Sequence, residues 1–472
     1  MEFLTIVAAI AALVWGAAFV LRGSVLAGCL AFIVLTTCFG YDFLHFNLAG
    51  MPLTLDRIWV GVMLVIYLIH RRLGMTDPKP MARVDWMLIA FLGLVSFSTL
   101  MIGKEQGFGS INPLIWHLFV GYLFPAMLYW FARQSTLKQS SVQRTILFLA
   151  VFGVYLGLTG LLEVAQQWSL VFPKYIADPK VGLHFGRARG PMVQSVSYGL
   201  YLGICIVAAL LWQGREEARQ PGKLFWLLLV PMELAAVMLT LTRSVWIGTG
   251  LALFLLAILT LKGMSRRLVV SAMVGAALLV LVAKSDSLLS IEREGGSASD
   301  AKSSAESRGG FAYLSWKMFQ DRPLWGFGFG QFPDAKLDYI DDRSTDLNLD
   351  IIRPLIHHNT YLSLLVDLGL VGLLLYLTVL VLWARAAWEL CRGVRRPVWV
   401  RTAGVLFLCS LATYGVQMMF HEVSYTSIDN SIIFVLAGIV TGLANGGADS
   451  RRTDLGRSSD QVLPNVAVAG GA

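Results

Sequence analysis

The chain has 472 residues, of which 56% are hydrophobic and only 14% are charged, and its formal net charge is +8. A soluble domain carries about 25% charged residues, so this composition excludes an ordinary soluble enzyme. The positive charge does not indicate nucleic-acid binding, because the basic residues lie mostly in short loops between apolar segments. We therefore expect an integral membrane protein that crosses the bilayer many times.

Apolar segments long enough to cross a bilayer recur along the chain. A transmembrane helix needs about 20 apolar residues to cover a hydrocarbon core of about 30 Å, and its backbone must be satisfied internally. We predict spans at residues 2–21, 23–40, 56–70, 85–102, 113–132, 145–167, 196–213, 224–241, 245–261, 268–283, 361–384, 402–420 and 430–445. The first is expected to be retained, because only Glu2 precedes its apolar run and no small-residue cleavage site follows it. The predicted fold class is an all-α polytopic membrane protein with about 12–13 transmembrane helices.

The basic residues define the orientation of these spans. Short cytoplasmic loops accumulate Lys and Arg, and the basic loops of this chain are separated by pairs of spans. Their cations include Arg71, Arg72, Lys79, Arg83, Arg133, Lys138, Arg144, Arg215, Arg219, Lys223, Lys262, Arg266, Arg267, Arg385, Arg392, Arg395, Arg396, Arg401, Arg451, Arg452 and Arg457. We assign this side to the cytoplasm, which places the C-terminus inside and the N-terminus outside.

The spans and loops suggest a division into four regions. These are N-terminal transmembrane helices at 1–180, a core at 181–375 that includes a large outer loop at 284–360, C-terminal transmembrane helices at 376–445, and a flexible cytoplasmic tail at 446–472. The outer loop is far longer than the few residues that usually join two helices. Loops of this length tend to carry function, so we expect the chemistry to lie on the periplasmic side.

Four stretches of the large loop differ in character. Residues 292–305 are small and polar, so we expect them to be mobile. Residues 311–320 have the spacing of a short helix on the membrane surface, and the acidic stretch 334–350 is predicted to form a second one. Residues 322–332 contain a glycine-rich run, but no strand precedes it and no Lys-Ser/Thr pair closes it as in a P-loop. A tight aromatic turn is the favoured reading.

Several ionisable residues stand close to the ends of spans. Arg187 and Arg189 precede one span, Arg243 lies in a very short turn between two spans, and Arg308 opens the surface segment of the large loop. A charge beside hydrocarbon is costly unless it is paired or functional, and the planar guanidinium group binds phosphate in a bidentate manner. Snorkelling to the interface is the alternative. It explains Arg57 well, but Arg243 less well, because so short a turn aims that side chain into the space between the helices.

Histidines and carboxylates complete the set of candidates. His357 and His358 end the large loop directly before a span. Histidine titrates near neutral pH and is the usual general base for a hydroxyl group. A simple polar cap is the alternative, whereas a metal site has no evident third ligand. Glu163 and Glu233 are intramembrane carboxylates near span ends and are weaker candidates.

Four motifs then resemble, in order, those of the bacterial O-antigen ligase and polysaccharide polymerase superfamily. Arg187-Ala-Arg-Gly190 is similar to its RxxG motif, and Thr240-Leu-Thr-Arg243-Ser is similar to its T-x-S/T-R turn. Arg322-Pro-Leu-Trp-Gly-Phe-Gly-Phe-Gly-Gln-Phe332 resembles its P-L-x-G-x-G-x-G-x-F turn, and His358-Asn-Thr-Tyr-Leu with Gly369 and Gly372 resembles its HNxxL…GxxG signature. Each motif alone is weak. Together they cover about 180–375 in the family's order, which makes the resemblance specific.

The resemblance implies a GT-C-like membrane glycosyltransferase that transfers or polymerises glycan from undecaprenyl diphosphate without a metal or cofactor. The residues carried over are catalytic Arg243, Arg308 and His358, and substrate-binding Arg187, Arg189, His357 and Asn359. The member of each adjacent pair that acts, His357 or His358 and Arg187 or Arg189, stays open. The implied partners are the carrier-linked glycan donor, a glycan or lipid-linked acceptor and membrane lipids, with no nucleic acid. The expected location is the bacterial inner membrane, with the site facing the periplasm.

The chemistry of the candidate residues is consistent with this hypothesis. Breaking an anomeric bond to diphosphate develops negative charge, which arginines in a partly dry site can stabilise. Attack by a hydroxyl from the opposite side would invert the anomeric centre. A lipid-linked oligosaccharide transporter or flippase is the alternative, but transporters typically show inverted repeats and broken polar helices at midplane. The sequence does not separate a ligase from a polymerase, because both use the same donor chemistry.

Overall fold

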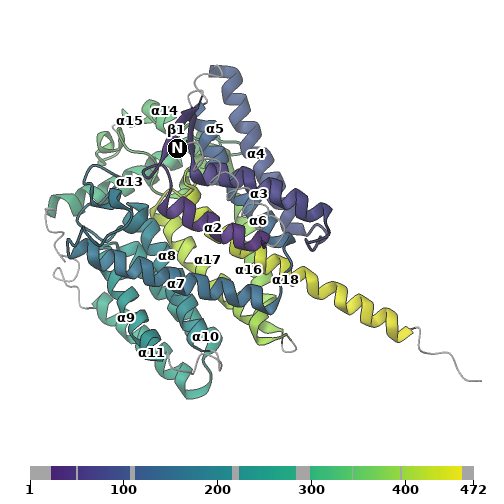
Figure 1. Ribbon diagram of the computed structural model, residues 1–472. Coiled ribbons are helices and arrows are strands. Elements are labelled where there is room, and N and C mark those ends of the chain that lie inside the picture. The colour runs from purple at the N-terminus through teal and green to yellow at the C-terminus, as the bar shows by residue number, and fades with distance from the viewer. Residues whose placement is uncertain are drawn as a thin grey trace, which may run out of the picture.

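The computed structural model describes residues 23–48, 51–106, 112–214, 223–282, 298–342, 344–393 and 396–459. The predicted first span at 2–21 lies outside these residues. The described part is almost entirely helical (Figure 1). Its sheet is one antiparallel hairpin of β1 (His45–Leu48) and β2 (Met51–Thr54), in which Phe46 pairs with Leu53. The predicted class, an all-α polytopic membrane protein, is confirmed.

Every predicted span from 23–40 onward has a helix at its position. The helices are α2 (Val25–Cys38), α3 (Leu55–Arg72), α4 (Arg83–Gln106), α5 (Asn112–Leu118) continuing through the π-helical η1 (Phe119–Leu123) into α6 (Phe124–Gln134), α7 (Gln139–Val164), α8 (Ser195–Gln213), α9 (Lys223–Leu239), α10 (Arg243–Thr260), α11 (Gly263–Val282), α16 (Thr360–Arg392), α17 (Val398–Phe420) and α18 (Ser427–Ser459). Within the described residues, 8 helical segments are long and apolar enough to cross a membrane. Two shorter apolar segments, Val25–Cys38 and Leu228–Leu239, accompany them.

Helices α8 and α18 form the centre of the bundle, since nearly every residue of their apolar segments is buried. Glycines let α18 approach α6 closely: a Cβ at Gly438 would lie 2.4 Å from the Tyr129 carbonyl oxygen, and one at Gly442 would lie 2.9 Å from that of Arg133. Small residues commonly permit such contacts between membrane helices. Beyond the bundle α18 continues as a projecting helix (Figure 1). The start of the predicted flexible tail is therefore helical, and residues 460–472 lie outside the described part.

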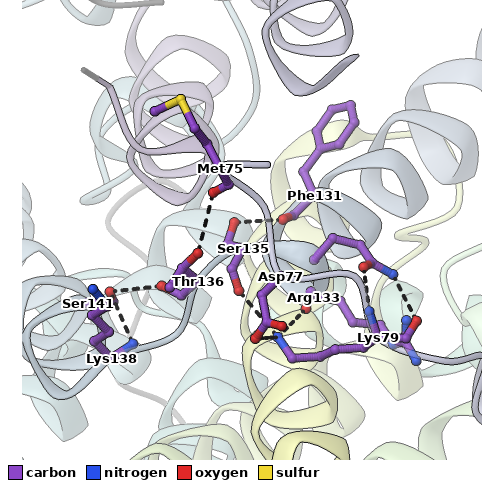
Figure 2. Close-up of polar contacts among 10 residues, drawn as sticks. Met75, Asp77, Lys79, Phe131, Arg133, Ser135, Thr136, Lys138 and Ser141 are labelled. Atoms are coloured by element: carbon purple, nitrogen blue, oxygen red, sulfur yellow. Dashed lines mark hydrogen bonds and ion pairs between the residues drawn. The ribbon is translucent and has the colours of Figure 1, made fainter. Parts of the chain in front are cut away.

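A polar cluster fastens the loop before α4 to the end of α6 (Figure 2). Lys79 Nζ donates to the carbonyl oxygens of Arg133 at 3.0 Å and Ser135 at 3.2 Å, and it lies 3.3 Å from the carboxylate of Asp77. Arg133 is itself fully buried, with Nη2 at 2.8 Å from Asp85 Oδ2. Lys79 and Arg133, two of the cations used to assign the cytoplasmic side, therefore also hold this loop in place.

The long helix α16 is broken at Gly369, where φ is 66° and ψ is −168°. The glycine-rich turn docks against this break through its backbone. The joining bonds run from Leu370 N to the Pro323 carbonyl (2.8 Å), from Phe327 N to that of Val366 (2.9 Å), and from Gly328 N to that of Asp367 (2.8 Å). A Cβ at Gly369 would lie 2.3 Å from the Leu324 carbonyl carbon, so only glycine permits this approach. The predicted tight turn is confirmed, and the amides of Phe327, Gly328 and Gly330 donate hydrogen bonds to α16.

The large loop folds over one end of the bundle, which we call the outer end. It contains α13 (Ala298–Asp321), α14 (Phe332–Ala335), α15 (Leu337–Ile340) and the 3₁₀ turn η5 (Leu349–Ile352), grouped at one edge of Figure 1. These elements enclose a small apolar core of Phe311, Leu314, Met318, Phe332, Ile340, Leu349, Ile352 and Val366 of α16. The loop is therefore packed onto α16.

Two expectations about the loop need correction. The helix predicted at 311–320 exists, but α13 begins at Ala298, so residues 298–305, expected to be mobile, are helical. The single helix predicted at 334–350 is wrong, because this stretch forms separate short turns. The chain turns at Asp342, whose carboxylate accepts hydrogen bonds from the Tyr313 hydroxyl at 2.7 Å and the Ser344 amide at 2.9 Å. Residues 292–297 lie outside the described part.

Candidate active site

The start of α16 is tied to the end of α17 at the outer end. Asn359 caps α16, because its Oδ1 accepts a hydrogen bond from Leu362 N at 3.0 Å, and its Nδ2 donates to the Met419 carbonyl at 3.0 Å. Thr360 Oγ1 donates to the His421 carbonyl at 2.8 Å. Asn359 was expected to bind substrate, but both ends of its amide serve the fold. The structure therefore gives it a positioning role beside the two histidines.

The two adjacent histidines occupy different environments. His357 is buried, its Nε2 lies 3.1 Å from Ser315 Oγ, and its ring centre lies 4.0 Å from that of Phe332. Burial, with the nearby charges of His358 and Lys336, lowers the pKa of His357 to about 3. This imidazole stays neutral inside the core of the loop, which argues against the expected substrate-binding role. His358 is exposed at the surface and is the member of the pair that a substrate can reach.

Arg308 brings a positive charge to His358. It lies on α13 with an exposed side chain, and its guanidinium carbon is 5.6 Å from the ring centre of Phe420, the last residue of α17. Partial removal of water lowers the pKa of His358, and the charge of Arg308 lowers it further. The packing of the large loop on α16 thus places an arginine beside the candidate base.

Arg243 lies at the same end of the bundle. It is the first residue of α10 and is exposed. Gly199 of α8 packs against Val245 of α10, and the contact repeats one turn further along both helices, so the two helices run parallel in this register. In this register Arg243 of α10 is level with Ser197 of α8, about one turn along the helix axis from Gln194, which directly precedes α8. Gln194 Nε2 lies 2.9 Å from His421 Nε2 at the end of α17.

Arg187 joins this group through the backbone beside it. The amide of Ala188 donates to the Leu239 carbonyl at 3.0 Å, which attaches the Arg187 segment to the end of α9 directly before the turn that carries Arg243. Arg187 is half-buried. The outer end thus gathers Arg187, Arg243, Arg308 and His358, four of the residues selected from the sequence.

Arg189 points elsewhere. It is wholly buried, and its Nε lies 3.1 Å from Glu163 Oε1 while its backbone amide donates to Glu163 Oε2 at 2.9 Å. The guanidinium nitrogens also donate to the carbonyl oxygens of Ile176, Asp178 and Val181. We had expected Arg189 to bind substrate, but its hydrogen bonds are used within the fold. Glu163, one of the two intramembrane carboxylates, is its partner.

Replacing Arg189 by Ala should destabilise the protein. Breaking a buried pair leaves an uncompensated charge and typically costs about 3–5 kcal/mol. We expect a clear fall in the midpoint of thermal unfolding of the detergent-purified protein, followed by fluorescence-detected size exclusion. The same change at Arg385, whose pair with Glu389 is exposed, is the matched control and should leave the midpoint nearly unchanged, because exposed ion pairs contribute little to stability. Equal midpoints for both variants would contradict the structural role of Arg189.

His421 was not selected from the sequence. It follows the last residue of α17, and burial with the nearby charges of His358 and His184 lowers its pKa to about 4. Its short distance to Gln194 links α17 to α8 beside the candidate site. His421 could have been selected from the sequence, because it directly follows a predicted span. The arginines were selected by the same criterion.

These features define a class: a multi-pass helical membrane protein with a cationic site and an accessible histidine, His358, at the end that carries its large loop. Residues 224–377 match the family model described as O-Antigen ligase (Wzy_C). Over these residues the chain is similar to the O-antigen ligase family, which confirms the resemblance drawn from its motifs for the matched segment. The matched segment includes Arg243, Arg308 and His358, whereas Arg187 precedes it. No curated protein matches the chain.

Proposed function

We propose that this protein transfers a glycan from undecaprenyl diphosphate to an acceptor hydroxyl at the periplasmic face of the bacterial inner membrane. The proposal rests on the O-antigen ligase domain and above all on one observation. The α13 helix of the large loop contacts the start of α16, since the ring centre of Phe311 lies 5.5 Å from that of His358, and Arg308 is one turn before Phe311 in α13. A phosphate-binding group and a candidate base are thus neighbours, as glycosyl transfer from a diphosphate requires.

The donor side of the reaction is assigned to the arginines. As the anomeric carbon–oxygen bond breaks, its electron pair leaves with the diphosphate oxygen. Arg243 and Arg308 stabilise that charge through paired N–H donors, and Arg187 adds a third positive charge. This use of the guanidinium groups lets the reaction proceed without a metal. The lipid tail of the carrier remains in the bilayer, where a site at the ends of the helices can reach the diphosphate.

The acceptor side is assigned to His358. Its lowered pKa keeps the imidazole neutral at physiological pH, so a ring nitrogen can accept the proton of the attacking hydroxyl. The hydroxyl oxygen forms the new glycosidic bond from the side opposite the diphosphate, which inverts the anomeric centre. Asn359 holds the start of α16 in position for this step.

Reconstitution tests this assignment. Wild-type protein in liposomes, supplied with carrier-linked glycan and candidate acceptors, should form a product of inverted anomeric configuration by NMR, and the rate should survive EDTA. A rate abolished by EDTA or a product of retained configuration contradicts the mechanism. The surface glycan of a deletion strain separates the two activities, because unattached long chains indicate a lost ligase and single repeats indicate a lost polymerase.

A further inference from the structure

A cavity of about 200 Å³ is lined mostly by residues that lie outside the four motifs. Its walls come from the end of α2, the start of α3, the segment before α8 and the start of α18. The side chains that matter for binding are Thr36, Tyr41, Asp42, Asp56, Arg57 and Tyr425. The cavity therefore combines two carboxylates, one guanidinium group and hydroxyl groups.

The polar groups of this cavity are held in place. Asp56 is buried and accepts hydrogen bonds from Thr36 Oγ1 at 3.3 Å and from the hydroxyl of Thr54. The guanidinium carbon of Arg57 lies 4.6 Å from the ring centre of Trp116, a cation–π contact that orients it. Arg57, attributed to snorkelling on sequence alone, thus lines a cavity. A fixed carboxylate next to a fixed guanidinium group offers both acceptors and donors to a ligand.

The chemistry of the cavity favours a sugar ring. Carboxylates accept hydrogen bonds from hydroxyl groups, and arginine donates to ring and hydroxyl oxygens. A diphosphate is disfavoured, because the carboxylates of Asp42 and Asp56 would repel it. The volume is below the roughly 300–1,000 Å³ of pockets for drug-sized ligands, so it suits one ring rather than a longer chain. One face of the exposed Tyr41 ring is stacked on His45, with ring centres 4.0 Å apart, so the other face is the one that a ligand can contact.

The cavity shares two segments with the candidate active site. Pro191 and Met192 line it and directly follow the Arg187–Gly190 segment, while Tyr425 lies four residues after His421. Tyr175, also in the lining, fixes this boundary by donating its hydroxyl to the Pro191 carbonyl at 2.7 Å. A ligand bound here would therefore contact segments that continue directly into those of the candidate active site.

We propose that this cavity is the subsite for one sugar ring of the acceptor. The inference rests on the proposed glycosyl transfer. The diphosphate of the donor requires the arginine cluster. A cavity with two carboxylates instead fits the acceptor sugar, which has hydroxyl groups but no diphosphate. Ring recognition at this place sets which acceptor the enzyme uses.

Transfer kinetics of the reconstituted full chain test the subsite. Asp42→Asn and Arg57→Gln should each raise the acceptor KM about tenfold, the loss expected for one hydrogen bond to a charged group. The donor KM, and kcat at saturating acceptor, should not change. Asp346→Asn, the same substitution at an exposed position of the large loop outside this lining, is the matched control. A higher donor KM, or unchanged acceptor KM in both variants, overturns the proposal.

Direct binding separates this proposal from the proposed function. Saturation-transfer NMR on the detergent-purified chain with methyl glycosides of a hexose and an N-acetylhexosamine should give signals that Asp42→Asn removes and Asp346→Asn retains. Glycerol 1-phosphate, a lipid-headgroup probe, should give none; binding of that probe alone overturns the sugar assignment. Glycoside binding by a wild-type protein that forms no product would refute the transfer reaction and the acceptor role together, and leave a sugar site.

Discussion

A His358→Ala protein should bind the carrier-linked donor with nearly wild-type affinity and fail to transfer its glycan. The arginines that bind the diphosphate remain in this variant, but no group is left to accept the proton of the attacking hydroxyl. Loss of a positioned general base typically lowers the rate about a hundredfold to ten-thousandfold. Single-turnover transfer in proteoliposomes, with donor binding measured separately, gives both quantities.

The neighbouring histidine supplies the control for this experiment. His357→Ala removes a buried ring from the core of the loop, so it should lower the yield of folded protein and largely spare the kcat of the protein that folds. A near wild-type rate in His358→Ala, together with a lost rate in His357→Ala, would reverse the assignment within the pair. If the wild-type protein forms no product and instead moves donor across vesicles, a flippase replaces the enzyme.

The pH dependence gives His358 a second readout. Because its pKa is lowered, the basic form predominates at neutral pH, and the transfer rate should fall only as the pH drops through that lowered pKa. Part of the lowering comes from the charge of Arg308. Arg308→Gln should therefore raise the pKa of His358 and move the acidic limb of the rate profile to higher pH, in addition to lowering the rate. An unmoved limb would argue against His358 as the base.

Arg243→Lys and Arg308→Lys should each lower kcat/KM by about a hundredfold to a thousandfold, the usual effect of losing one donor to a developing anion. Lysine keeps the charge but cannot offer two parallel N–H groups to one phosphate. The exposed pair of Arg353 with Asp350 in the large loop allows a matched Arg353→Lys control, which should keep full activity. Wild-type activity in both test variants would remove the bidentate contact from the mechanism. Thermal unfolding of each variant checks that the fold is retained.

The positions of the helices could be predicted from the sequence, because a bilayer demands long apolar runs that few other structures need. The outer-end arginines could be selected for a similar reason, since charge beside hydrocarbon is costly. The sequence could not distinguish two residues of the same type when one is buried in a salt bridge and the other is not. Arg187 and Arg189 are two positions apart, yet only Arg189 meets Glu163, 26 residues earlier.

The same limit applies to the large loop. The acidic stretch 334–350 has the polarity of a surface helix, but its fold depends on Tyr313 from α13, which binds Asp342. His357 and His358 differ only because the side chains of α13 and α14 enclose the first. Such long-range contacts cannot be read from local spacing. Asn359 was carried over as a substrate ligand, although its place directly before a span is also typical of a helix cap.

The break in α16 also bears on the order in which the protein is made. The glycine turn is synthesised before α16. Its carbonyl and amide groups can therefore form their hydrogen bonds to α16 only after that helix has left the ribosome. When α16 enters the bilayer, an unbonded backbone group at Gly369 and Leu370 would be costly in hydrocarbon. Docking of the turn removes that cost. We therefore expect docking of the turn and membrane insertion of α16 to be coupled, so that a chain that misplaces the turn inserts this helix poorly.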